Sequence, residues 1–94
     1  MRNKEEARGI ASAEIERLRT LSRDKLLEYI DNPHTWEVVD ESGTTFQLEA
    51  LAFWEDRKRE NFRVVVSIDD GGLSAFVPMS QDFIVAPDGS FVGE

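Results

Sequence analysis

The chain has 94 residues, with 40% hydrophobic and 32% charged side chains, a composition typical of one soluble globular domain. It contains no cysteine, which excludes a disulfide framework, a thiol nucleophile and a thiolate metal site. The formal net charge of -8 opposes non-specific binding to nucleic acid or anionic lipid, because both are also negative. We expect a single domain over residues 1–94, with a helical segment at 1–32 and an antiparallel sheet with a C-terminal strap at 33–94.

The charge is uneven along the chain. Residues 1–30 hold seven basic and six acidic side chains, whereas residues 31–94 hold four basic and thirteen acidic ones. The N-terminus lacks the apolar core of a secretion signal, and the longest apolar run, Ala50–Trp54, is too short to cross a bilayer. We therefore expect a cytoplasmic, bacterial-type protein that binds neither membrane nor nucleic acid and prefers basic or neutral partners.

Helical spacing extends from about Lys4 to Ile30, but its apolar stripe changes direction near Leu21. The later apolar residues are rotated by roughly 100° from the earlier ones on a helical wheel, so one straight helix cannot bury both sets. Ser22 can act as the N-cap of a second helix. The pattern predicts a first helix from Lys4 to about Thr20 and a short second helix that ends at Asp31-Asn32-Pro33.

After Pro33 the hydrophobic pattern has a period of two, which is typical of strands. Strands are expected at Trp36–Asp40, Thr45–Trp54, Phe62–Ile68 and Leu73–Val77. Two short apolar pieces follow, Asp82–Val85 and Phe91–Val92, and they are expected to form a strap or hairpin around a turn at 86–90. The fold class is α+β: an N-terminal helix, broken into two near Leu21-Ser22, packed on an antiparallel β-meander, with a short C-terminal strap.

Turn chemistry predicts the register of these strands. Asp69-Asp70-Gly71-Gly72 suits a type I′ turn, with Gly71 supplying positive φ. This turn pairs Ile68 with Leu73, Val66 with Ala75 and Val64 with Val77. The preceding loop, at 55–61, pairs Trp54 with Phe62, Ala52 with Val64 and Ala50 with Val66. Because the alanines leave room for close packing, the helices are expected on this face of the sheet.

The opposite face carries more apolar side chains than a solvated face should. The predicted register places Leu51, Val65 and Phe76 in one row, and it places Phe53 beside Arg63, where a cation–π contact can form. These five residues are our candidate partner or dimer surface. Three covers stay open: the C-terminal strap (Phe83, Ile84, Val85, Phe91 and Val92), a second copy of the chain, or a foreign partner.

The histidine and the aspartates in turns are the two candidate sites for metal binding or catalysis. His34, the only histidine, lacks metal-ligand spacing and is expected to cap the second helix or lie in solvent. Carboxylates in or near turns can hold Ca²⁺ or Mg²⁺, although aspartate before glycine is also ordinary turn chemistry; the residues concerned are Asp69, Asp70, Asp82 and Asp88. No catalytic residue, cofactor or metal ligand is predicted.

One basic loop, Arg57-Lys58-Arg59 with Arg63 nearby, interrupts the acidic part of the chain. It can grip a phosphate or an acidic peptide, or simply be a solvated loop that discourages aggregation.

The favoured function is a small acidic, non-enzymatic protein-interaction module, such as an immunity- or antitoxin-like inhibitor, a regulatory adaptor or a self-associating domain. Residues 31–56 hold seven acidic and no basic side chains, a distribution that speeds encounter with a basic partner. The alternative is a minimal enzyme or divalent-cation-binding domain that uses the turn aspartates.

Overall fold

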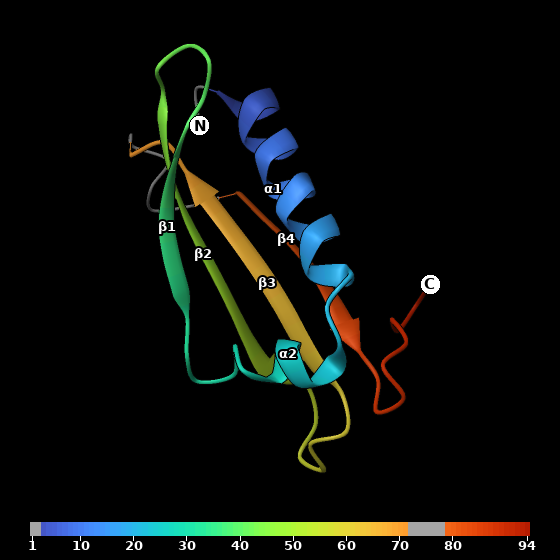
Figure 1. Cartoon of the computed structure of the whole chain (residues 1–94). Helices are drawn as coiled ribbons and strands as arrows, with labels where there is room; N and C mark the ends of the chain where they lie inside the picture. Colours follow the sequence, from blue (N-terminus) through green and yellow to red (C-terminus); the bar gives the residue numbers. More distant parts are fainter. Residues whose placement is uncertain (1–2, 72–78) are drawn as a thin grey trace.

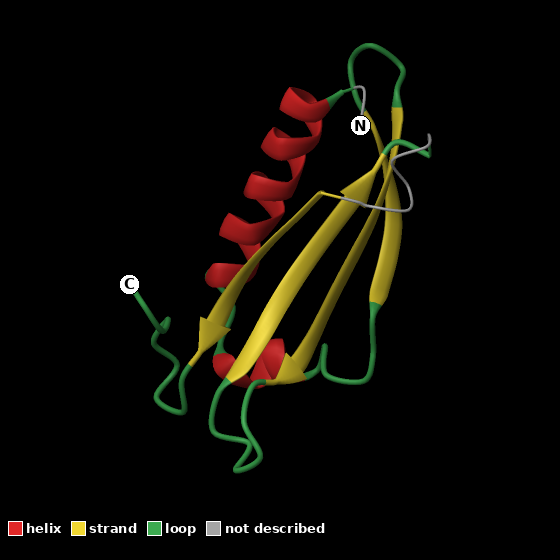
Figure 2. Cartoon of the chain, turned by 180° about the vertical axis from the view of Figure 1, so that it is seen from behind, coloured by secondary structure: helices red, strands yellow, loops and turns green. Residues whose placement is uncertain are grey.

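The computed structural model describes residues 3–71 and 79–94. These ranges contain two helices, α1 (Lys4–Arg19) and α2 (Arg23–Leu27), and four strands: β1 (His34–Val39), β2 (Thr45–Trp54), β3 (Phe62–Asp69) and β4 (Met79–Val85). The strands form one antiparallel sheet in the order β1-β2-β3-β4. Figure 1 shows both helices on one side of the sheet, and Figure 2 shows the sheet from the other side. The predicted α+β meander is confirmed.

The predicted break between the helices is also confirmed. Thr20 closes α1 by donating its N–H to the Arg17 carbonyl. Ser22 then caps α2, because its side-chain oxygen accepts the backbone N–H of Lys25. Beyond α2, the carbonyl of Tyr29 accepts the N–H of Ala52, which ties the end of the helical segment to β2. The two helical pieces can therefore follow different directions over one sheet.

The strand β1 begins two residues earlier than predicted, at His34, whose side chain is exposed to solvent, as in one of its two expected placements. Its ring lies against that of Tyr29, with 4.3 Å between the centroids. β1 ends at a three-residue turn in which Gly43 has φ +87°, its N–H donates to the Asp40 carbonyl, and the Asp40 N–H donates to the Thr44 carbonyl. This is a type I turn followed by a left-handed residue, a common hairpin connection.

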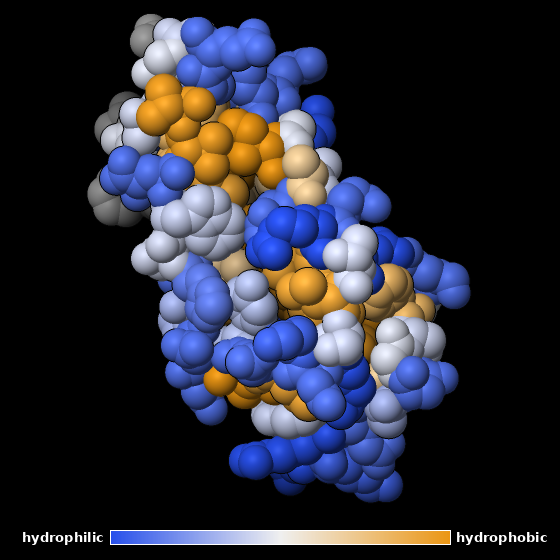
Figure 3. Space-filling view, viewed as in Figure 1, coloured by the Kyte–Doolittle hydropathy of each residue, from blue (hydrophilic) through white to orange (hydrophobic). Residues whose placement is uncertain are grey.

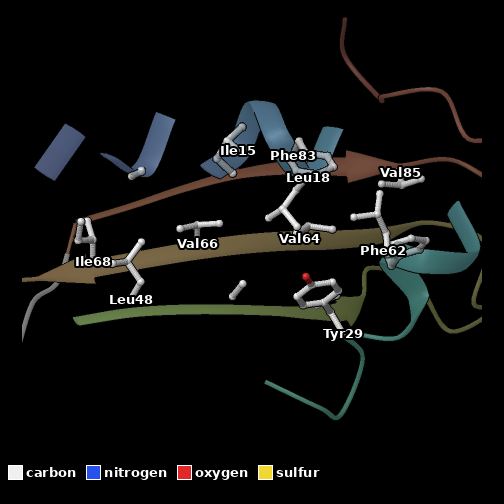
Figure 4. Close-up of a cluster of buried hydrophobic side chains, with 14 of the residues drawn as sticks. Ile15, Leu18, Tyr29, Leu48, Phe62, Val64, Val66, Ile68, Phe83 and Val85 are labelled. Atoms are coloured by element: carbon white, nitrogen blue, oxygen red, sulfur yellow. The ribbon is translucent and has the colours of Figure 1, made fainter. Parts of the chain in front are cut away.

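The register of β2 and β3 is as predicted. Trp54 pairs with Phe62, Ala52 with Val64 and Ala50 with Val66. The helix-side face of the sheet forms the hydrophobic core with α1 and α2 (Figure 4). Buried there are Ala7, Ala11, Ile15, Leu18, Leu26, Tyr29, Phe46, Leu48, Ala50, Ala52, Phe62, Val64, Val66, Ile68, Phe83 and Val85.

The predicted partner of β3 is wrong. β3 pairs with Met79–Val85, so that Ile68 lies opposite Met79, Val66 opposite Gln81 and Val64 opposite Phe83. The segment predicted as the partner, residues 73–77 with Phe76, lies outside the described residues. Gly71 does have positive φ, at +79°, but β3 ends at Asp69 and β4 begins only at Met79. The register found buries Phe83 and Val85, which are 4% and 1% exposed, and this burial outweighs the local turn signal.

The C-terminal strap, one of the three covers that the sequence leaves open, does not cover the opposite face. Phe83 and Val85 belong to β4 and face the helices, so they do not cover the opposite face. The turn at 86–90 forms as expected, with Ala86 and Ser90 hydrogen-bonded, and it returns Phe91 to an antiparallel bridge with Val85. The rings of Phe83 and Phe91 meet edge to face, with centroids 5.2 Å apart. The C-terminal segment therefore extends the sheet beside β4.

Candidate protein-interaction surface

The face of the sheet away from the helices gathers apolar side chains toward the end where the 55–61 loop joins β2 to β3. Figure 2 shows the sheet from this side. Leu51 of β2 lies beside Val65 of β3, as predicted. On the next row, Ile84 of β4 lies beside Arg63. Val92 continues this row, because its N–H donates to the Ile84 carbonyl and its neighbour Phe91 points to the helix side. We call the set Leu51, Phe53, Val65, Ile84 and Val92 the open-face patch.

The patch is partly exposed. Phe53 is 43% exposed and Val92 47% exposed, and these are two of the three most exposed large hydrophobic residues in the described ranges. Leu51, Val65 and Ile84 are half-buried by their neighbours in the sheet. The helices lie on the other side of the sheet, and the segments that the sequence suggested as a cover form part of β4 and its extension.

Arg63 lies in the middle of the patch, between Phe53 and Ile84. Its Nε donates to Oε1 of Glu55 at 2.6 Å, and its Nη1 donates to Oδ1 of Asp82 at 2.8 Å. The hydrogen bond that Arg63 donates to Glu55 is the main cause of a raised pKa of Arg63. Both carboxylates thus neutralise the guanidinium and hold it along the sheet.

The predicted stacking of Arg63 on Phe53 is replaced by these two ion pairs. In the described part of the chain, the arginines that lie over aromatic rings are Arg19, 4.5 Å from the Phe91 centroid, and Arg23, 5.4 Å from that of Phe62. Both of these contacts belong to the helix side and help to hold the helices on the core.

Four of the five predicted surface residues are brought together: Leu51, Phe53, Arg63 and Val65. Phe76 lies outside the described residues, and the position opposite Val65 is occupied by Asp82. Sequence reasoning missed Ile84 and Val92 as members of the sheet face, since it assigned both to a covering strap. The alternation Phe83-Ile84-Val85 was the available signal, because it places Ile84 on the face opposite to its two neighbours.

The basic loop forms the exposed connection between β2 and β3, and Arg57, Lys58 and Arg59 are all exposed. Its shape comes from Asp56, whose carboxylate accepts the backbone N–H groups of Glu60 and Asn61. These hydrogen bonds, first that from Glu60, lower the pKa of Asp56. Arg63 contributes no free charge to this loop, since it is paired with two carboxylates.

Of the four turn aspartates, Asp69 and Asp70 are adjacent in the chain, whereas Asp82 lies in β4 and Asp88 in the turn at 86–90. Asp69 accepts the N–H of Gly71, and Asp82 pairs with Arg63. Asp88 accepts both the N–H and the hydroxyl of Ser90, and the hydroxyl contact is the main cause of its lowered pKa. In residues 3–71 and 79–94, no three histidine, aspartate or glutamate side chains are grouped so that they could hold a metal ion.

Comparison of the chain with models of protein families, with curated proteins and with solved structures finds no match. In the described ranges, neither helix is long and apolar enough to span a membrane. A function must therefore be inferred from the residues and their arrangement.

Proposed function

We propose that the protein is a small acidic, non-enzymatic protein-interaction module that binds a partner through the open-face patch. The observation that carries this proposal is the gathering of five apolar side chains from three strands and the C-terminal segment on the face that the helices leave open. Exposed apolar side chains gathered in this way are typical of protein interfaces.

The chemistry around the patch suits a docking site. Phe53 is an aromatic anchor of the kind that supplies much of the binding energy at interfaces. Arg63 fills the centre and is paired with two carboxylates, so this cluster keeps an excess negative charge that a basic partner can offset. The polar row beyond Leu51 and Val65, which contains Glu49 and Ser67, supplies a hydrophilic rim.

The charge of the chain favours a basic partner. The net charge is -8, and residues 31–56 contain acidic side chains and no basic ones. Such a field accelerates encounter with a cationic protein and discourages association between identical copies. An immunity- or antitoxin-like inhibitor of a basic effector and a regulatory adaptor both fit this chemistry. We place the module in the cytoplasm, where a protein without cysteine needs no oxidising compartment.

The proposal is tested with two single-charge variants of the full chain. Phe53→Glu puts a carboxylate into the patch, whereas Val39→Glu puts one at an exposed apolar position near the opposite end of the same face, 62% exposed. Both residues are exposed enough for the variants to stay folded, which circular dichroism verifies. Tagged wild-type and variant proteins are then used to recover partners from the source cell, with quantitative mass spectrometry.

We expect a basic protein that is retained by the wild type and by Val39→Glu and lost with Phe53→Glu. Reconstitution with the purified partner then gives the affinity of each variant. Equal affinity of wild type and Phe53→Glu for that partner refutes the proposal. If the wild type sediments as a dimer that Phe53→Glu dissociates, the patch is a self-association site and the foreign-partner version is wrong.

A further inference from the structure

The helix layer covers only part of the sheet. α1 packs on β3 and β4, and Figure 1 shows β1 and the upper half of β2 lying beside the helix. Four strands about 4.8 Å apart form a face roughly 19 Å wide, whereas one helix with its side chains is about 10–12 Å across. One helix therefore leaves a strip of the helix-side face without a second layer.

A groove of about 540 Å³ opens at one end of this strip, between the N-terminal part of α1 and the turn that joins β1 to β2. α1 contributes Gly9, Ile10 and Ala13 to its wall. Trp36 and Val38, on the helix-side face of β1, are only half-buried at this margin of the core. In Figure 3, which has the view of Figure 1, apolar residues reach the surface between α1 and the β1–β2 hairpin.

The shape of the α1 wall suits close approach by another helix. Gly9 and Ala13 are four residues apart on α1, so they lie one turn above the other on the same side. A Cβ built on Gly9 meets no atom within 4 Å, so the surface there is open. Small residues at such positions allow two helices to pack with axes about 8–10 Å apart.

The rim of the groove is acidic. Glu6 stands on α1, and Asp40 and Glu41 stand on the turn facing it, while among residues 3–71 and 79–94 no basic residue lines the groove. The side-chain hydrogen bond from Ser42 lowers the pKa of Asp40, so this carboxylate is charged at neutral pH. An apolar wall on α1 under a negative rim is complementary to a helix with one apolar face and flanking cations.

We propose that this groove binds a cationic amphipathic helix of a partner protein, which completes the helix layer over β1 and β2. The groove lies on the opposite side of the sheet from the open-face patch, so this inference stands independently of the proposed function. A foreign helix is favoured over α1 of a second copy, because two chains of net charge -8 repel each other.

The probe is a synthetic 18-residue helical peptide with a leucine stripe flanked by lysines, and its control is the same peptide with glutamate in place of lysine. Binding to the full chain is measured by titration calorimetry and mapped by amide chemical shifts. We expect saturable binding of the lysine peptide, with shifts centred on Ile10, Trp36 and Val38, and no binding of the glutamate peptide.

Charge-matched variants separate a site from general attraction. Glu6→Gln/Glu41→Gln removes two charges from the rim, whereas Glu5→Gln/Glu60→Gln removes two exposed charges elsewhere. The rim variant should bind the lysine peptide about fivefold more weakly, and the control variant should stay within about twofold of wild type. Phe53→Glu should leave this binding unchanged, which keeps the test separate from that of the open-face patch.

Three results overturn the inference: no binding of the lysine peptide, equal weakening by the two charge-matched variants, or chemical shifts centred on the open-face patch. A fourth is self-association of the wild type that Ile10→Ser abolishes, since the occupant is then a second copy of the chain. Failure of this test leaves the open-face proposal intact.

Discussion

Leu18 is the side chain that best tests the placement of α1 on the sheet. It is 0% exposed and belongs to the core cluster that joins α1 to β3 and β4 (Figure 4). Leu18→Ala removes three carbons, which corresponds to about 2.4 kcal/mol of transfer free energy at ~0.8 kcal/mol per carbon. The cavity that remains adds to this value, so we expect a loss of about 3 kcal/mol in the free energy of unfolding.

Ile10 provides the matched comparison. It lies on the same helix but only half-buried, at the wall of the groove. Ile10→Ala should lose about 1 kcal/mol or less, because solvent already reaches the side chain and little cavity forms. The contrast between the two variants depends on α1 lying over β3 and β4 rather than over the centre of the sheet.

The assay is urea unfolding followed by tryptophan fluorescence and by circular dichroism, with coincident transitions as the test of two-state behaviour. A loss of about 3 kcal/mol should lower the melting temperature of a domain of this size by roughly 12–24 °C. Equal losses for Leu18→Ala and Ile10→Ala, or an unchanged midpoint for Leu18→Ala, would refute the described packing of the helix.

Two further predictions concern the turns and α1. Gly43→Val should lower the free energy of unfolding by at least about 1 kcal/mol, because Gly43 has φ +87°. Gly9→Ala should raise it by about 0.5–1 kcal/mol, because Gly9 is exposed and lies in a helix. Melting curves in which both variants shift the melting temperature in the same direction contradict this. The lowered pKa of Asp56, due first to the Glu60 N–H, means that the folded form binds fewer protons than the unfolded form below about pH 4. The stabilisation that Asp56 contributes is therefore present above that pH and lost as the pH falls through its folded pKa. The free energy of unfolding of Asp56→Asn should then fall less between pH 7 and 3 than that of the wild type. Parallel pH profiles of the two proteins would contradict the role of this carboxylate.

The register of β2 and β3 was predictable because two independent signals agree. In each strand, buried and less buried side chains alternate over the whole length, and the polar loop at 55–61 fixes where β2 ends and β3 begins. A slip of one residue would expose Val64 and Val66, so burial permits a single register. The placement of Leu51, Phe53, Arg63 and Val65 on the other face follows from this register.

The partner of β3 was not predictable by the same means. Asp70-Gly71 has good hairpin chemistry, and Gly71 has the expected positive φ, yet turn chemistry concerns only a few neighbouring residues. The choice between two apolar partners, residues 73–77 and Met79–Val85, depends on which one fills the core under α1. Phe83 and Val85 do so, and that depends on contacts between distant parts of the chain.

The groove beside α1 could not be predicted from the sequence, for a related reason. Helical periodicity identifies Ala7, Ala11, Ile15 and Leu18 as the buried face of α1. It does not say which strands that face covers, because the lateral position of a helix on a sheet depends on the packing of side chains from several strands. Ile10 also has the helical spacing of an apolar residue, but only the position of α1 makes it a groove wall.

One long helix is too narrow to cover one face of a four-stranded sheet, and it leaves the other face without a second layer. The open-face patch lies on the side without helices, and the groove lies on the side where α1 packs mainly on β3 and β4. Exposed apolar surface normally promotes association of identical chains, but a net charge of -8 opposes it. The same charge attracts cationic surfaces, so the uncovered apolar residues and the acidic composition favour the same kind of occupant. A basic partner that brings both an apolar face and a helix would satisfy the two sides of the sheet at once, and the variants at Phe53 and at Glu6 with Glu41 would then weaken its binding independently and additively.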